Sequence, residues 1–405
     1  MLKIGKTYLH HTDGQVRLCA DISLNGRGTT LWFGVDEAQA DCLCAQRSDA
    51  FVMALLPTAM RGGYTIQSES PVSRQLHYQL TNYLIPTLCQ VGDLYHPVQI
   101  HAPLRAEPVK NAGGVGTGFS GGVDCLYTVM THGADSAYPL THIAVFNVGA
   151  FDGSEYRKNF QNACADATAF AKEQALNLIC LDSNLAEALP EDFLEVCSYR
   201  NLAGALALQG LFSVYLLSSG IAFSKFYFNL GSGATYDMLS VQCARTENLT
   251  FYSSGGEVHR QEKLKALADW QPAHRWLHPC FRNRLTRGNC GKCKKCIHTM
   301  TELYAYGVLD RFAPVFDVAA YEANFSQNIG YLLTIQDQPF YQTALQLLKD
   351  RKIPIPAEAY EEAEKLRNQG RNTGNTKAEQ QDALRVLAQN LRKAKLQKTT
   401  PEDKL

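Results

Sequence analysis

The sequence has no excess charge of either sign. Its 405 residues include 39 lysines and arginines against 39 aspartates and glutamates. A chain with balanced charge has no overall field that would draw it to nucleic acid or to an anionic membrane surface. We therefore expect a phosphate group, if one is bound, to be held by a local cluster of residues, and we expect neither a membrane nor a nucleic acid as the partner.

The sequence also lacks a hydrophobic signal near its N-terminus. Its 13 cysteines are an odd number and are spread over a long chain. This usage is typical of a reducing compartment, where thiols bind metals or fill protein cores. We expect a cytoplasmic protein without disulfides.

One long uncharged stretch needs a separate explanation. Residues 201–224 carry no charged side chain and are long enough to cross a bilayer. Gln209, four serines and three glycines interrupt the stretch. We expect a buried helix of an α/β domain here rather than a transmembrane helix.

The chain is expected to have three regions. Residues 1–105 mix strand-like runs with helical segments, which predicts an N-terminal α+β domain. From residue 106 to 306 strands alternate with helices, which predicts an α/β domain with a parallel sheet. Residues 307–405 are expected to form a C-terminal helical region followed by a polar tail.

A glycine-rich loop, FSGGVDC at residues 119–125, follows the first strand of the central region. It lacks the lysine of a Walker A loop. The glycines at 116, 118 and 121 fit G-x-G-x-x-G, but no strand precedes the first of them, as a dinucleotide-binding motif requires. The remaining interpretation takes residues 115–119 as the strand and 120–125 as the turn into a helix.

The residue types of this turn suit a phosphate. The hydroxyl of Ser120 and the backbone N–H groups of two glycines can close around an anion at a helix N-terminus. Asp124 can hold a magnesium ion against the phosphates. The predicted phosphate-binding set consists of Gly118, Ser120, Gly121, Gly122, Val123, Asp124 and Cys125.

The turn resembles the S-G-G-x-D-S loop of the ATP pyrophosphatases, the PP-loop family. Cys125 stands where that loop has a serine, and sulfur is a weak hydrogen-bond partner. A thiol at a helix N-terminus can also be activated as a nucleophile. A tolerated exchange of one small residue for another is the simpler explanation.

A second motif lies within residues 278–300. Its four cysteines are spaced C-x9-C-x2-C-x2-C, which supplies the thiolates of a tetrahedral structural zinc site: Cys280, Cys290, Cys293 and Cys296. Four protein ligands leave no open position, so we expect a structural role, with a redox or iron–sulfur role as the alternative. Six basic residues surround the motif: Arg282, Arg284, Arg287, Lys292, Lys294 and Lys295. They suit either a nucleic acid or a triphosphate, and the balanced charge of the chain favours the triphosphate.

Together the two motifs resemble the 7-cyano-7-deazaguanine synthase (QueC) family over about residues 115–306. The segment YRNLAGALAL at 199–208 resembles the Arg-Asn helix start of that family, and HRQEKLKAL at 259–267 lies where a lysine-bearing helix is expected. The resemblance implies a PP-loop fold of the HUP, Rossmann-like type and a homodimer, with ATP, Mg²⁺ and Zn²⁺ as cofactors.

The resemblance also implies a reaction. ATP would activate the carboxylate of 7-carboxy-7-deazaguanine as an adenylate, and ammonia would convert this to the amide and then to the nitrile. Ser120 and Asp124 would act at the phosphates, and Arg200 would offset charge on the acyl phosphate.

The chain departs from that family in two respects. Residues 146–160, FNVGAFDGSEYRKNF, lack the histidine expected after the second strand, and the chain is longer at both ends. The longer architecture resembles QueC-like proteins of bacterial anti-phage defence operons, which implies that the acyl acceptor is an amine of a partner protein. Two alternatives stay open: sulfur insertion into a nucleobase through a persulfide on Cys125 or Cys197, and a nucleotide- or RNA-binding protein without turnover.

Overall fold

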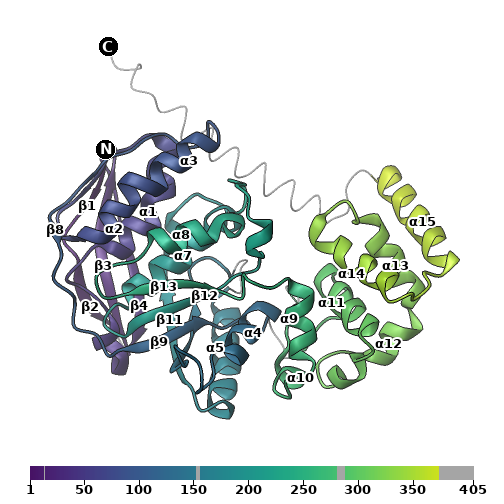
Figure 1. Cartoon of the computed structure of the whole chain (residues 1–405). Coiled ribbons are helices and arrows are strands. Elements are labelled where there is room, and N and C mark those ends of the chain that lie inside the picture. The colour runs from purple at the N-terminus through teal and green to yellow at the C-terminus, as the bar shows by residue number, and fades with distance from the viewer. Residues whose placement is uncertain (13, 152–155, 281–287, 374–405) are drawn as a thin grey trace. The chain divides into compact units, whose positions relative to one another are not determined.

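The computed structural model describes residues 1–12, 14–151, 156–280 and 288–373. It shows an α/β protein with a mostly parallel central sheet (Figure 1). The chain divides into two compact units, Met1–Asn289 and Cys290–Leu405.

Five parallel strands form the centre of the first unit. They are β9 (Gly114–Gly118), β10 (His142–Phe146), β11 (Asn177–Ser183), β12 (Phe212–Ser218) and β13 (Thr250–Ser254). Every pairing among them is parallel, as the alternation of strands and helices predicts. They lie side by side in the order β13-β12-β9-β10-β11, so the direction of winding reverses between β9 and β12.

The N-terminal strands extend the same sheet. They are β1 (Leu2–Ile4), β2 (Tyr8–Thr12), β3 (Gln15–Leu24), β4 (Arg27–Asp36), β5 (Ile66–Ser68) and β7 (Ile100–His101), while β6 (Val72–Ser73) pairs with β8 (Leu104–Arg105). Strand β4 pairs antiparallel with β11, whose open edge would otherwise expose backbone N–H and C=O groups. The expected domain boundary at residue 105 therefore falls inside one unit, which also shares one hydrophobic core.

Helices cover this sheet. The longer ones are α1 (Asp49–Gly62), α4 (Val123–Thr131), α5 (Tyr156–Glu173), α7 (Phe193–Ala207) and α9 (Arg260–Leu267), and the shorter ones are α2 (Arg74–Gln79), α3 (Ile85–Val91), α6 (Leu185–Ala188), α8 (Asp237–Cys243) and α10 (Ala273–Trp276). Helices α4 and α5 pack on the parallel strands, and α1 packs on α7. Gly204 lets α7 approach Phe146 of β10 closely, since an added Cβ would come 2.9 Å from that ring.

The uncharged stretch at 201–224 is not a single helix. Its first residues complete α7, and Phe212–Ser218 form β12, one of the five parallel strands. Both parts are largely buried, as expected, but the chain turns at Gly210, whose backbone lies against the carbonyl of Asp41. None of the helices described is long and apolar enough to cross a membrane.

The prediction that the chain has no disulfide is wrong. Cys164 of α5 is bonded to Cys180 of β11. Helix α5 packs on β10 and β11, which brings the two Cα atoms to 6.3 Å, a separation that a disulfide can span. The spacing of these cysteines in the sequence gives no sign of this packing.

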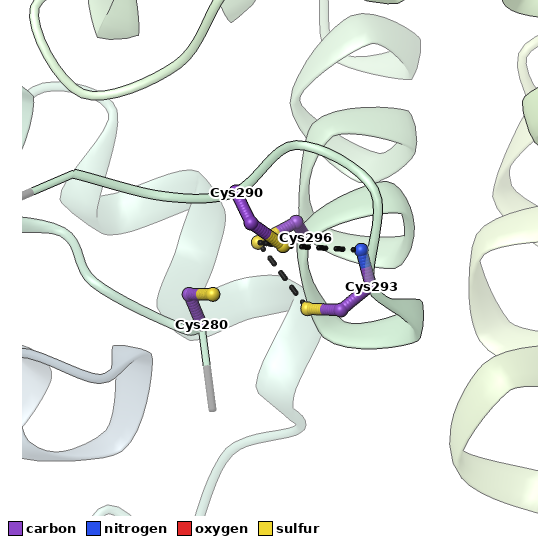
Figure 2. Close-up of side chains that lie close together, drawn as sticks. All are labelled: Cys280, Cys290, Cys293 and Cys296. Atoms are coloured by element: carbon purple, nitrogen blue, oxygen red, sulfur yellow. Dashed lines mark hydrogen bonds between the residues drawn. The ribbon is translucent and has the colours of Figure 1, made fainter. Parts of the chain in front are cut away.

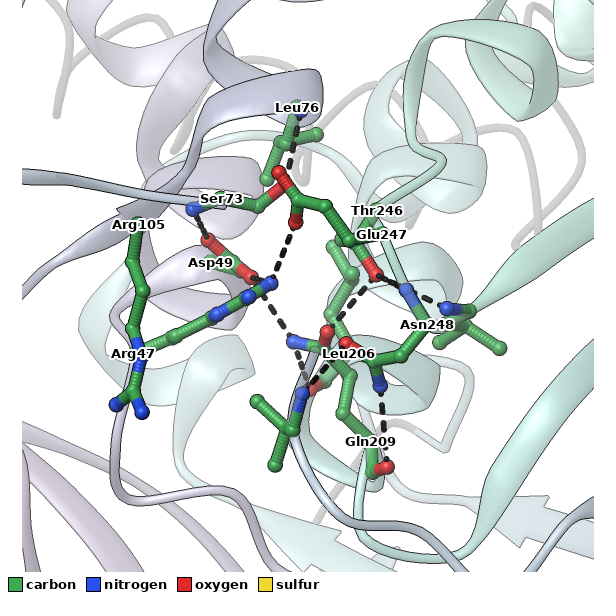
Figure 3. Close-up of polar contacts among 12 residues, drawn as sticks. Arg47, Asp49, Ser73, Leu76, Arg105, Leu206, Gln209, Thr246, Glu247 and Asn248 are labelled. Carbon is green, nitrogen blue, oxygen red and sulfur yellow. Dashed lines mark hydrogen bonds and ion pairs between the residues drawn. The ribbon is translucent and has the colours of Figure 1, made fainter. Parts of the chain in front are cut away.

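A buried polar network ties α1 to loops of the parallel domain (Figure 3). The carboxylate of Asp49 accepts hydrogen bonds from the backbone N–H of Ser73 (2.8 Å) and from the side chain of Gln209 (3.0 Å). Arg47 Nη1 lies 2.8 Å from Glu247 Oε2 and 3.8 Å from Asp49 Oδ2. Burial raises the pKa of Asp49 to about 6, although Ser73, Gln209 and Arg47 act in the opposite direction.

The second unit consists of helices over its described residues, 290–373. They are α11 (Lys294–Ala305), α12 (Val318–Ala323), α13 (Phe325–Thr334), α14 (Pro339–Asp350) and α15 (Ala357–Thr373). Helix α13 packs on α15, and α11 packs on α14, so the expected boundary at residue 306 falls inside this unit. The expected polar tail at 374–405 lies outside the described residues.

Candidate functional site

The winding of the central sheet marks one place for a ligand. Connections leave β9 and β12 in opposite directions, and in sheets of this kind ligands bind in the crevice at the carboxyl ends of the two diverging strands. The glycine-rich loop, Phe119–Gly122, follows β9, and Ser219 follows β12. The sequence-predicted loop thus lies at the reversal point.

The loop holds its shape through Gly121. This residue has φ +70, and an added Cβ would come 3.1 Å from both the Cβ of His278 and the carbonyl of Trp276. Its own carbonyl accepts a 2.7 Å hydrogen bond from the N–H of His278. Only glycine combines a left-handed backbone with this close approach.

Helix α4 starts directly after the loop. Gly122 is its N-cap residue and provides no side chain to cap the helix, so the first N–H groups are directed toward the loop. The N–H of Gly122 donates to Ser120 Oγ at 3.3 Å, and the ring of Phe119 stacks on Phe170 of α5 at 4.5 Å. The arrangement resembles an anion site at a helix N-terminus, with Ser120 exposed beside it.

Asp124, in the first turn of α4, faces a buried lysine. Nζ of Lys263 donates to Asp124 Oδ1 at 2.9 Å and to the carbonyl of Ser219 at 2.6 Å. The Lys263 side chain is 1% exposed, whereas that of Asp124 is 28% exposed. A cation and a carboxylate therefore meet at the reversal point of the sheet.

Lys263 belongs to the helix that the sequence marked as lysine-bearing, but it is missing from the predicted site residues. A capping box starts α9, because the side chains of His259 and Glu262 each bond the other's backbone N–H. Lys263 lies with Leu264 and Leu267 on the buried face of α9, which packs on α4. The i, i+4 spacing of Lys263 to Leu267 is the sequence signal that separates Lys263 from Lys265.

A second carboxylate, Asp237, lies behind this pair. It is 5% exposed, and its Oδ2 accepts a 3.0 Å hydrogen bond from the hydroxyl of Ser219. Burial raises the pKa of Asp237 to about 6, while Ser219 and Lys263 act in the opposite direction and Asp124 adds to the increase. No motif in the sequence indicated this residue.

Three predicted phosphate-binding residues have mainly structural contacts. Gly118 ends β9, and Val123 is buried at the start of α4. Cys125 is buried as well, and its Sγ accepts a hydrogen bond from the N–H of Ser120 at 3.4 Å. Burial raises the pKa of the Cys125 thiol, which is the opposite of activation at a helix N-terminus.

Arg200 is placed elsewhere along the carboxyl edge of the sheet. Its Nη2 donates to the carbonyls of Glu191 (3.2 Å) and Leu189 (3.5 Å), and its Nη1 lies beside Gly149, after β10. Burial lowers the pKa of this guanidinium. Across the described residues, no hydrogen bond or ion pair joins Arg200 to the loop or to Asp124.

The four predicted metal ligands do come together (Figure 2). The sulfur atoms of Cys280, Cys290, Cys293 and Cys296 all lie within 4.8 Å of one another. The Cys293 and Cys296 sulfurs are 3.4 Å apart, and those of Cys290 and Cys296 are 3.9 Å apart. Zinc–sulfur bonds of about 2.3 Å in a tetrahedron place sulfurs about 3.8 Å apart, so the cluster fits a zinc ion.

The turn between two of these ligands has a defined geometry. Gly291 has φ +67, and the N–H of Cys293 donates to Sγ of Cys290 at 3.3 Å. Among the basic residues near the motif, Lys294 lies over the ring of Tyr341 at 5.3 Å. Three arginines expected to contribute charge, Arg282, Arg284 and Arg287, lie outside the described residues.

Comparison of the chain with protein-family models, with curated proteins and with solved structures finds no match.

Proposed function

We propose that the chain is an ATP-dependent enzyme that converts a carboxylate into an adenylate and passes the acyl group to a nitrogen nucleophile. The observation that carries this proposal is the pair of Asp124 and Lys263 at the N-terminus of α4, where the sheet reverses. A carboxylate for a magnesium ion and a cation for a phosphate are the two charges that such a reaction needs.

Each part of the site has a role in this proposal. The N–H groups of Gly121 and Gly122 and the start of α4 bind the phosphates. Asp124 holds Mg²⁺, which neutralises charge on the pyrophosphate that leaves. Lys263 balances the charge of the bound phosphates once Asp124 has turned to the metal ion.

The fold and the zinc site are part of the same proposal. The order of the five parallel strands, with the glycine loop directly after the first of them, supports a PP-loop domain of the HUP type. Zinc on the four cysteines would act as a structural clasp, since four thiolates leave no open position. A cytoplasmic location is proposed from the cysteine usage of the chain, and a homodimer from the family resemblance alone.

The substrate and the acceptor also come from that resemblance. We propose 7-carboxy-7-deazaguanine as the carboxylate, with ammonia or an amine of a partner protein as the nucleophile. The Arg200 side chain is 2% exposed and donates to two backbone carbonyls, so a direct role at the acyl phosphate would depend on a rearrangement.

Sulfur insertion finds less support. It needs a reactive thiol outside the zinc cluster, and burial raises the pKa of both candidates, Cys125 and Cys197. A raised pKa leaves little thiolate near pH 7, and the thiolate is the nucleophile.

The test is product analysis by mass spectrometry. Purified protein is incubated with magnesium-ATP and 7-carboxy-7-deazaguanine, first with ammonia and then with candidate partner proteins. We expect AMP, pyrophosphate and either a nitrile or a partner protein of increased mass. Asp124→Asn should abolish AMP formation, whereas Asp135→Asn, an exposed aspartate in a turn after α4, should not. Unchanged ATP in every mixture would refute the proposal for this substrate.

A further inference from the structure

The ammonium of Lys263 is buried, bonds the carboxylate of Asp124 at 2.9 Å, and is linked through Ser219 to a second carboxylate, Asp237, of different exposure. An isolated charge is costly in a protein interior unless a partner stays beside it. Asp124, on the loop side, is 28% exposed and can reach a ligand, whereas Asp237 is 5% exposed and cannot. The two acids therefore cannot have the same role toward Lys263.

Ser219 connects the two sides. Its carbonyl accepts from Lys263 Nζ at 2.6 Å, and its hydroxyl donates to Asp237 Oδ2 at 3.0 Å. The ammonium also packs closely against Gly255, which has φ +77 and where an added Cβ would lie 3.2 Å from Nζ. Lys263 is thus fixed in place, while Asp124 is the partner that can move.

We propose that Asp237 is the permanent counter-ion of Lys263 and that Asp124 is the exchangeable one, so that Lys263 can pass from Asp124 to a bound phosphate with its charge still balanced. This inference rests on the proposed function for the identity of the ligand. Asp237 is then a positioning residue, since it acts through Lys263 and Ser219 and does not touch the substrate.

The charged groups near Asp237 set its pKa, and this pKa can be measured. Lys263 of α9 lowers its pKa, Asp124 of α4 raises it, and the thiol of Cys197 on α7 lies within electrostatic reach. Removing the charge of Asp124 should therefore make Asp237 bind its proton less tightly. A metal ion on Asp124 should have the same effect, so binding of the metal near pH 6 should release a proton from Asp237.

The first experiment does not depend on ATP. Difference infrared spectroscopy is carried out on the full chain carrying Asp49→Asn, because the pKa of the buried Asp49 is also about 6. Between pH 5 and pH 7.5 it should show a buried carboxylic acid that loses its proton, and adding Asp237→Asn should remove this band. In Asp124→Asn the titration midpoint of the band should move to lower pH, which corresponds to a proton affinity of Asp237 that is weaker by about threefold or more. A midpoint that Asp124→Asn leaves unchanged would overturn the inference.

The second experiment uses magnesium-ATP. Asp237→Asn should raise the KM for magnesium-ATP about tenfold or more and should remove the acid limb near pH 6 from the pH profile, while Asp135→Asn changes neither. If Asp237→Asn does not fold, Ser219→Ala takes its place, because it removes the hydroxyl link and keeps the carbonyl that Lys263 bonds.

The outcomes separate the two proposals. Absence of AMP formation together with the expected infrared titrations would refute the proposed function and leave the charge exchange standing. An active enzyme whose pH profile and KM are the same in wild type and in Asp237→Asn would refute the charge exchange alone.

Discussion

Replacing Asp49 by asparagine tests how the buried network of α1 depends on pH. Burial raises the pKa of Asp49 from 3.8 to about 6 in the folded chain. A carboxyl group whose pKa is higher in the folded state than in the unfolded state stabilises the folded state by binding a proton more tightly there. This stabilisation is complete below the pKa of the unfolded state and is lost as the pH rises through the folded-state pKa of about 6. The wild type should therefore lose stability, relative to Asp49→Asn, as the pH increases.

The magnitude follows from the shift. A difference of about two units corresponds to about 3 kcal/mol between the acid and alkaline limits, at about 1.4 kcal/mol per unit. Part of this is already lost by pH 5, so about 1.4 kcal/mol should be lost between pH 5 and pH 8. Asparagine also presents an N–H₂ group toward Gln209, whose amide now donates to Asp49 at 3.0 Å. This mismatch should cost about 1 to 3 kcal/mol at every pH and so does not affect the slope.

Urea unfolding followed by circular dichroism at several pH values measures this slope. The free energy of unfolding of the wild type, minus that of Asp49→Asn, should decrease by about 1.4 kcal/mol from pH 5 to pH 8. Parallel curves for the two proteins would refute the reasoning, because they would show that Arg47, 3.8 Å from the carboxylate, keeps Asp49 ionised throughout. Asp135→Asn should give a curve parallel to the wild type.

Three further results are expected. Gly121→Ala should lower the free energy of unfolding, measured by thermal unfolding, by about 1 to 2 kcal/mol and should weaken nucleotide binding. The reason is that Gly121 has φ +70 and that an added Cβ would lie 3.1 Å from His278. Gly133→Ala, where an added Cβ would have no atom within 4 Å, should have little effect. Cys293→Ser should lose the zinc measured by elemental analysis of the purified protein, whereas Cys89→Ser, outside the cluster, should keep it; equal zinc in both would refute the site. The affinity for ATP, measured by calorimetry, should be low when magnesium is chelated. Asp124→Asn should reduce the increase in ATP affinity that magnesium causes. Equal wild-type affinity with and without magnesium would count against Asp124 as the metal ligand.

Local patterns predicted much of this structure. Strands, loop and helix around residues 114–131 form where the apolar runs and glycines place them. The prediction that the four cysteines form a cluster is confirmed. Three of them lie within one turn and the start of one helix, so the local sequence brings them together. These features depend on short stretches of chain, so their geometry is largely contained in the local sequence.

What the sequence did not reveal depends on packing between distant elements. The disulfide of Cys164 with Cys180 forms because α5 lies along β11. Strand β4 extends the parallel sheet by pairing with β11. The apolar pattern of a strand does not predict which other strand it pairs with. The prediction of one helix for the uncharged stretch is wrong in its second half, because periodicity alone does not separate a buried helix from a buried strand.

The charge balance of the site bears on how a chain of neutral composition would bind the polyphosphate of the proposed function. With both carboxylates ionised, Asp124 and Asp237 outweigh Lys263 by one negative charge, which repels a free nucleotide. In the proposed function, a divalent cation on Asp124 would reverse that sign, and the same ion would release Lys263 toward the phosphates. The charge that attracts the ligand would then arrive with the metal, so the proposal requires no basic surface.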